Sequence, residues 1–121
     1  MRPTEIKLHQ NTRILELSYE DGTVHNLPCE YLRVYSPSAE VRGHGPGEEV
    51  LQLGKEQVEI TGIEPTGNYA VTLTFSDGHN SGIYDWGLLR ELGDKYEENW
   101  ATYLQRLKEA GYTRKTGNEV I

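Results

Sequence analysis

The chain has 121 residues, 36% of them hydrophobic, which is enough for one domain with a real core but leaves little length for a second. Its 12 basic and 19 acidic residues give a net charge of −7, which disfavours nucleic acid as a partner because phosphates carry the same sign. The single cysteine, Cys29, excludes an internal disulfide and a thiolate-rich zinc cage, and the lack of a long apolar run argues against a signal peptide or membrane span. We therefore expect a cytoplasmic protein without membrane contact.

The first third predicts a strand hairpin that leads into a short helix. Strands are expected over residues 5–9, 13–20 and 23–27. The dipeptide Asp21-Gly22 between the last two is typical of a type I′ turn, in which both central residues have positive φ. Pro28 fits the first turn of a helix, because its missing N–H has no helical partner there.

The middle of the chain predicts a loop followed by more strands. Residues 36–49 have no periodicity and contain three glycines and two prolines, so we expect a surface loop. Two strands are expected over residues 57–63 and 68–76, with a turn at residues 64–67. Asp77-Gly78 predicts a second hairpin, whose return strand covers residues 80–84.

The last third predicts helices. Asp85 is expected to cap a helix that ends at Gly93, and Asp94 and Glu97 have the form of a capping box for the next helix. One face of that helix carries Tyr96, Trp100, Tyr103, Leu104 and Leu107. Residues 113–121 are expected to be a flexible tail after a single domain of residues 1–112.

One motif of the sequence occurs twice. In each copy, alternating apolar residues lead to an aromatic residue and Asp-Gly, and a Leu-Arg pair follows about ten residues later. Asp21 and Asp77 lie 56 positions apart, and Arg33 and Arg90 lie 57 positions apart. The repeat predicts an α+β fold with a small antiparallel β-sheet built from two related hairpin-plus-helix units, and with the C-terminal helices packed on one face.

Several separate motifs, in this order, resemble one family. They are Tyr31-Leu32-Arg33, Ser-Pro-Ser-Ala-Glu at residues 36–40, Gly-His-Gly-Pro-Gly at residues 43–47, Gly-Asn-Tyr-Ala at residues 67–70 and Asp-Gly-His-Asn-Ser-Gly-Ile-Tyr at residues 77–84. From about residue 4 to residue 92 the chain resembles the DUF971 family, the γ-butyrobetaine hydroxylase-like N-terminal domain, in its stand-alone bacterial form.

The resemblance implies an accessory domain. In γ-butyrobetaine hydroxylase the iron oxygenase chemistry lies in a separate, larger barrel. A related domain is appended to some Mrp-type P-loop proteins linked to iron–sulfur cluster delivery. The resemblance therefore transfers no established activity to this chain.

The resemblance also implies the position of a lost zinc site. In the hydroxylase domain three Cys and one His hold a structural zinc, and these positions fall on Ser36, Ser38, Val41 and His79 of this chain. Neither serine nor valine replaces a thiolate, so we expect the zinc site to be largely lost.

Three hypotheses remain for His79. It hydrogen-bonds the loop of residues 36–47 as a relic of the zinc site, or it binds a divalent metal (Zn or Fe) together with His44 and Asp77, or it contacts a ligand or partner. In the third case Tyr31, Tyr35 and Tyr69 are expected to line a groove beside the glycine-rich part of the loop.

No constellation in the sequence predicts catalysis. None of the four histidines is followed two residues later by an acid, as the facial triad of an iron oxygenase requires. The glycine-rich loop lacks the Gly-Lys-Ser/Thr ending of a phosphate loop. Asp21 and Asp77 are explained by hairpin turns, Cys29 is expected to be buried, and the spacing predicts no Ser-His or Cys-His pair.

We therefore expect a non-catalytic accessory or interaction module without a cofactor, which binds an unidentified protein or small molecule. Its expected interaction surface comprises Tyr35, His44, Tyr69 and His79. The alternative is a metal-binding module that uses His79 and His44 and is linked, by family association, to iron–sulfur or metal handling.

Overall fold

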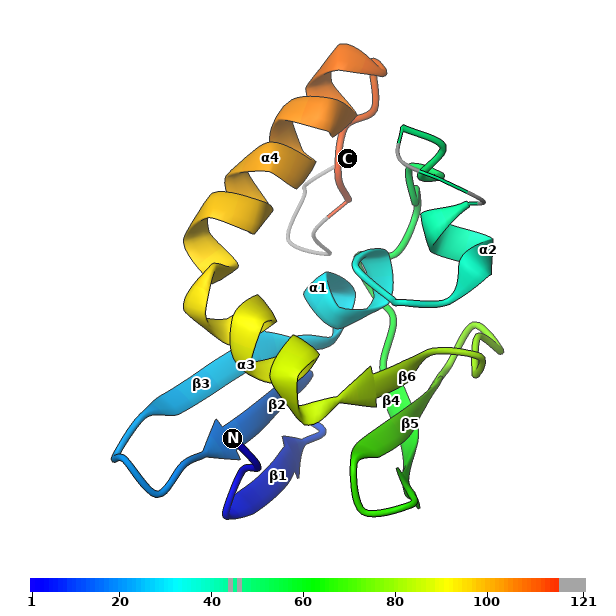
Figure 1. Cartoon of the computed structure of the whole chain (residues 1–121). Coiled ribbons are helices and arrows are strands. Elements are labelled where there is room, and N and C mark those ends of the chain that lie inside the picture. The colour runs from blue at the N-terminus through cyan, green and yellow to red at the C-terminus, as the bar shows by residue number, and fades with distance from the viewer. Residues whose placement is uncertain (44, 46, 116–121) are drawn as a thin grey trace.

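Figure 1 shows the computed structural model, which describes residues 1–43, 45 and 47–115. The first half of the chain contains β1 (Glu5–His9), β2 (Ile14–Ser18), β3 (Val24–Pro28), α1 (Cys29–Val34) and α2 (Ala39–Arg42). The second half contains β4 (Ile60–Thr66), β5 (Ala70–Phe75), β6 (Ile83–Asp85), α3 (Trp86–Asp94) and α4 (Tyr96–Glu109). Each half is thus a unit of three strands followed by two helices, which explains the repeat in the sequence.

The α+β class, the two related units and the placement of the helices are confirmed. The strands form two antiparallel sheets, in the orders β1-β2-β3 and β4-β5-β6, where one sheet was expected. Because each unit pairs its strands through its own hairpins, and β3 and β6 run directly into helices, neither sheet continues into the other. The helices lie on one side of both sheets (Figure 1).

Some element boundaries differ from the prediction. α2 lies within the predicted loop, and the Ser38 hydroxyl caps it by accepting the N–H of Glu40. β4 begins later than predicted and includes Pro65, which an edge strand tolerates. The capping box at Asp94 does not form, because that carboxylate accepts hydrogen bonds from Arg90 and pairs with His25.

The type I′ turn predicted at Asp21-Gly22 is wrong. Only Gly22 has a positive φ, of 87°. Its N–H donates to the carbonyl of Tyr19 over 3.0 Å, and the N–H of Tyr19 donates to Thr23 over 2.9 Å, which together make a three-residue loop with a bulge at the glycine. Asp21 keeps a negative φ, so its carboxylate can accept the N–H of Thr23 over 3.0 Å. The second hairpin repeats this turn at Gly78, with a φ of 90°.

The core lies between the two sheets and the helices and joins the two units. Fully buried side chains from both units include Leu15, Leu17, Tyr31, Leu32, Leu73, Phe75, Tyr84 and Leu89. Two tyrosine hydroxyls cross between the units: Tyr31 donates to the carbonyl of Leu92 over 2.7 Å, and Tyr84 donates to the carbonyl of Leu32 over 2.6 Å. On α4 the predicted apolar face is correct for Tyr103 and Leu107, which are buried, while Leu104 is exposed.

The repeated Asp-Gly and Leu-Arg motifs bind one another across the two units. Arg33 of α1 donates from Nε to Oδ2 of Asp77 in the second hairpin, over 2.9 Å. Arg90 of α3 makes the matching bond from Nη2 to Oδ2 of Asp21 in the first hairpin, over 3.2 Å. The arginine of each unit therefore holds the turn of the other, which gives the two repeated motifs a tertiary role.

Candidate functional site

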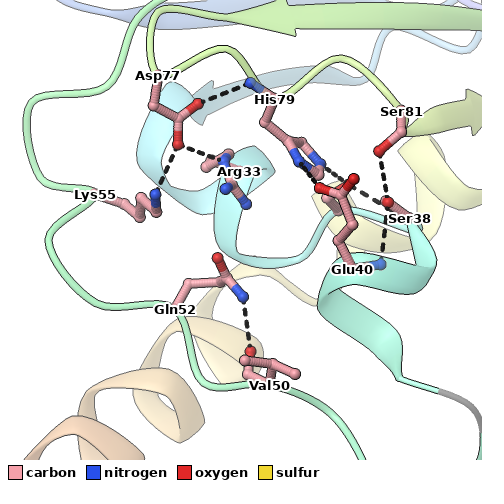
Figure 2. A network of polar contacts seen from close by, with 10 residues as sticks. Arg33, Ser38, Glu40, Val50, Gln52, Lys55, Asp77, His79 and Ser81 are labelled. Carbon is pink, nitrogen blue, oxygen red and sulfur yellow. Dashed lines mark hydrogen bonds and ion pairs between the residues drawn. The ribbon is translucent and has the colours of Figure 1, made fainter.

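His79 connects the second hairpin to the segment that contains α2, as the relic hypothesis predicted. The Asp77 carboxylate accepts the main-chain N–H of His79 over 3.2 Å and so stabilises the turn of the second hairpin. Its Nε2 lies 2.8 Å from Oγ of Ser36, and its Nδ1 lies 3.1 Å from Oε2 of Glu40 (Figure 2). Only 2% of the His79 side chain is exposed, and both of its ring nitrogens are hydrogen-bonded to other residues of the domain.

The two inherited serine positions belong to the same network. Oγ of Ser36 accepts the N–H of Ser38 over 3.2 Å, and Oγ of Ser38 lies 2.7 Å from Oγ of Ser81 (Figure 2). Val41, the third inherited position, is buried on α2. Hydrogen bonds of the two serine hydroxyls therefore join this segment to the β5–β6 loop.

The surroundings of His79 favour its neutral form. Burial lowers the pKa of the imidazole, and the Arg33 guanidinium lowers it further, while the carboxylates of Glu40 and Asp77 act in the opposite direction. With Nδ1–H donating to Glu40, Nε2 accepts the hydroxyl hydrogen of Ser36, so each group of the network has a consistent donor and acceptor role.

Sequence reasoning missed that Ser36, His79 and Glu40 are connected as in a serine–histidine–acid triad. The spacing gave no sign of the connection, because the Ser36–His79 and Glu40–His79 pairs span 43 and 39 residues. Ser36 is fully buried, and a Cβ atom added to Gly82 would lie 2.5 Å from its hydroxyl oxygen. This buried connection links the β5–β6 loop to the segment that contains α2, and we call it the clasp.

The other predicted site residues are not brought together. His44 lies outside the described residues. Tyr35 donates its hydroxyl to the carbonyl of Asn99 on α4 over 2.7 Å, and Tyr31 is fully buried in the core. Tyr69 is exposed in the β4–β5 turn at the far end of the second sheet (Figure 1). The expected tyrosine groove therefore does not form, because α1 turns Tyr31 and Tyr35 toward the core and α4.

The expected metal site gains no further ligands from the part of the chain that the structure describes. Within residues 1–43, 45 and 47–115, no three His, Cys, Asp or Glu side chains gather in a way that could hold a metal ion. Cys29 is buried, as predicted, and burial raises the pKa of its thiol.

A cavity of about 450 Å³ lies on another side of the molecule, between β3 and the junction of α3 and α4. Residues 24–27 form one wall and residues 93–98 form the other. Nε2 of His25 on one wall lies 2.9 Å from Oδ1 of Asp94 on the other. No motif in the sequence indicates this cavity, because the strand and the helix junction are distant along the chain.

A family model described as Gamma-butyrobetaine hydroxylase-like, N-terminal, matches residues 6–90. The chain belongs to this family. Two protein structures solved by NMR in solution resemble it. The first is 45% identical with a TM-score of 0.82, and the match covers 99% of this chain and 94% of that protein's chain. The second is 47% identical with a TM-score of 0.79, and the match covers 93% of this chain and 84% of that protein's chain. A crystal structure of a DUF971 protein of unknown function from Acidithiobacillus ferrooxidans is 39% identical over 76% of this chain and 92% of its own, with a TM-score of 0.64. No curated protein matches significantly.

Membership in the DUF971 family confirms the resemblance drawn from the motifs. The family match ends within α3, whereas the structural match to the first NMR structure covers nearly the whole chain, including the region of α4. The walls of the β3 cavity in this DUF971 domain thus come partly from the family core and partly from the α3–α4 junction beyond it. Among the described residues, none forms a helix long and apolar enough to cross a membrane.

Proposed function

We propose that this DUF971 domain is a non-catalytic interaction module that binds an extended, basic segment of a protein partner along the free edge of β3. The observation that carries the proposal is the position of the 450 Å³ cavity beside an unpaired strand edge. Edge strands offer a row of main-chain donors and acceptors, which a partner strand recognises by adding itself to the sheet.

The hydrogen-bond pattern of the first hairpin shows which main-chain groups are available. Tyr19 and Thr23 bond across the hairpin, and so do Arg13 and Cys29, and in an antiparallel pair the bonded positions alternate. The N–H and C=O groups of Val24 and Asn26 therefore point away from β2, toward the cavity. Among the described residues, no other element donates a hydrogen bond to them or accepts one.

The charge on the facing wall selects the partner. Residues 93–98 contribute three carboxylates, of Asp94, Glu97 and Glu98, against one ammonium, of Lys95. Asp94 is paired with His25 and Arg90, while Glu97 and Glu98 are exposed at the start of α4. This wall, on a chain of net charge −7, favours a segment that carries Lys or Arg at alternate positions.

Titration of the ¹⁵N-labelled protein with an alternating Lys-Val octapeptide tests the proposal. We expect amide shifts at residues 24–27 and 93–98, and much weaker shifts with the matching Glu-Val peptide. Asn26→Pro removes an outward N–H and should abolish binding, whereas Asn26→Thr changes the same side chain, keeps the N–H and should bind normally. Absence of shifts, equal binding of the acidic peptide, or self-association through β3 that Asn26→Pro prevents would each refute the proposed partner.

The proposal includes no metal cofactor, because both ring nitrogens of His79 are already hydrogen-bonded. We expect protein purified without chelator to contain well below one equivalent of zinc or iron, as measured by elemental analysis. His79→Ala should leave this metal content unchanged and lower the stability, since it removes the clasp between the hairpin and α2. About one equivalent of metal that is lost in His79→Ala would instead establish the metal-binding alternative.

A further inference from the structure

A buried acid on α1 has a cationic partner from the other end of the chain. Glu30 lies in the first turn of the helix, and only 8% of its side chain is exposed. A carboxylate at such a depth requires a charged partner, because its transfer out of water is costly. Arg114 supplies that partner in bidentate form, from Nε to Oε2 over 3.0 Å and from Nη2 to Oε1 over 2.5 Å.

An aromatic wall completes the site around the guanidinium. Cζ of Arg114 lies 5.1 Å from the ring centroid of Trp100, which is within the range of a cation–π contact. The Trp100 ring is held in turn by Tyr103, at a centroid distance of 5.3 Å, and by Tyr96, which stacks on it at 6.3 Å. The site is therefore preformed by α1 and α4, and Arg114 fills it.

The segment that carries Arg114 is held from the outside by polar contacts. We call residues 112–115 the strap; it turns back from the end of α4 toward α1 (Figure 1). One oxygen of Glu56, Oε2, accepts the hydroxyl of Tyr112 and the main-chain N–H of Lys115, each over 2.6 Å. Water can replace such contacts at the surface when the strap lifts away. A cavity of about 200 Å³ already lies beside the guanidinium, between Glu30, Glu56 and Arg13.

We propose that Glu30 and Trp100 form a guanidinium-binding site that Arg114 occupies as an internal ligand, and that an arginine side chain of a partner protein enters it when the strap is displaced. Arginine fits this site better than lysine, because only a planar guanidinium can make two parallel bonds to the carboxylate and stack on the indole. Glu30, Trp100 and Arg114 do not line the β3 cavity, and only Tyr96, which stacks on Trp100, belongs to both sites. The inference therefore goes beyond the proposed function and is tested separately from it.

The test uses the full chain with Arg114→Ser and the probe N-acetyl-arginine methylamide. Arg114 is tethered close to the site and competes at a high effective concentration. We therefore expect the variant to bind the probe at least about tenfold more tightly than the wild type does. The readouts are Trp100 fluorescence and amide shifts around Glu30. The matching lysine probe should bind several-fold more weakly, and Glu30→Gln added to Arg114→Ser should abolish binding.

Arg114→Lys keeps the positive charge beside Glu30 but loses the forked geometry, so it serves as the second variant if Arg114→Ser does not fold. It too should admit the arginine probe more readily than the wild type. A folded variant that shows no response at Glu30 and Trp100, equal binding of the lysine probe, or unfolding of both variants would overturn the proposal. Asn26→Pro, which tests the β3 edge, should leave arginine binding unchanged, so that failure of one idea is distinguishable from failure of the other.

Discussion

The Asp77→Asn variant is expected to lose about 2 kcal/mol of unfolding free energy at neutral pH. The change removes the negative charge that faces Arg33, whose side chain is only 8% exposed, and Lys55, whose Nζ lies 2.7 Å from the same oxygen. Asparagine keeps an oxygen that can accept the N–H of His79, so the turn itself is retained. Chemical denaturation of both proteins at pH 7 measures the difference.

The same pair predicts a specific dependence on pH. Burial raises the pKa of Asp77, but bonds from Lys55 and the N–H of His79, with the charge of Arg33, outweigh this and hold the pKa at about 2, against an ordinary value of 3.8. A carboxyl group with a lowered folded-state pKa stabilises the fold above its unfolded pKa, and this contribution is lost as the pH falls from about 4 to about 2. The gap between wild type and Asp77→Asn should therefore close over that interval.

The repeat supplies a matched control. Asp21 occupies the equivalent turn, but its carboxylate is more exposed than that of Asp77, and its partner Arg90 is also more exposed than Arg33. Asp21→Asn should consequently cost much less stability than Asp77→Asn. Equal losses in the two variants would contradict the conclusion that burial of Arg33 makes the second pair the stronger one.

Gly93→Ala is expected to destabilise the fold by about 2 kcal/mol, although alanine is the better helix former. A Cβ atom at this position would lie 2.2 Å from Cδ2 and 2.5 Å from Cγ of His25. The imidazole packs against the helix end and is held there by its 2.9 Å bond to Asp94, so it must leave its place and give up that bond. Thermal or chemical denaturation measures the loss.

Two further variants separate this clash from general effects of the substitution. Gly87→Ala changes a glycine in the same helix, where the added Cβ meets nothing closer than the Asp85 carboxylate at 3.4 Å, and it should be neutral or slightly stabilising. In a His25→Ala background, Gly93→Ala should lose most of its cost, because the ring that it would strike is gone. An unchanged cost in that background would refute the clash as the cause.

The site around His79 was predictable from the sequence only for those residues that belong to a recognisable motif. The resemblance placed Ser36 and His79 at positions of one lost zinc site, and the structure brings them within a hydrogen bond. Glu40 carried no signal, since an exposed acid at the start of a short helix is ordinary, and its bond to His79 depends on how the β5–β6 loop packs against α2. The tyrosine groove failed for the same kind of reason, because residue type does not tell which way a short helix turns its rings.

By itself the sequence determined those features that depend on residues close together along the chain. Alternation placed β2, and Asp85 placed the start of α3, because side chains within a few residues govern strand faces and helix caps. The duplicated motif likewise determined that two related units exist. Only the tertiary structure decided which charges meet: Arg33 with Asp77 across 44 residues, and Glu30 with Arg114 across 84. Such pairs depend on how one unit packs on the other, and a buried charge is stable only where that packing supplies its partner.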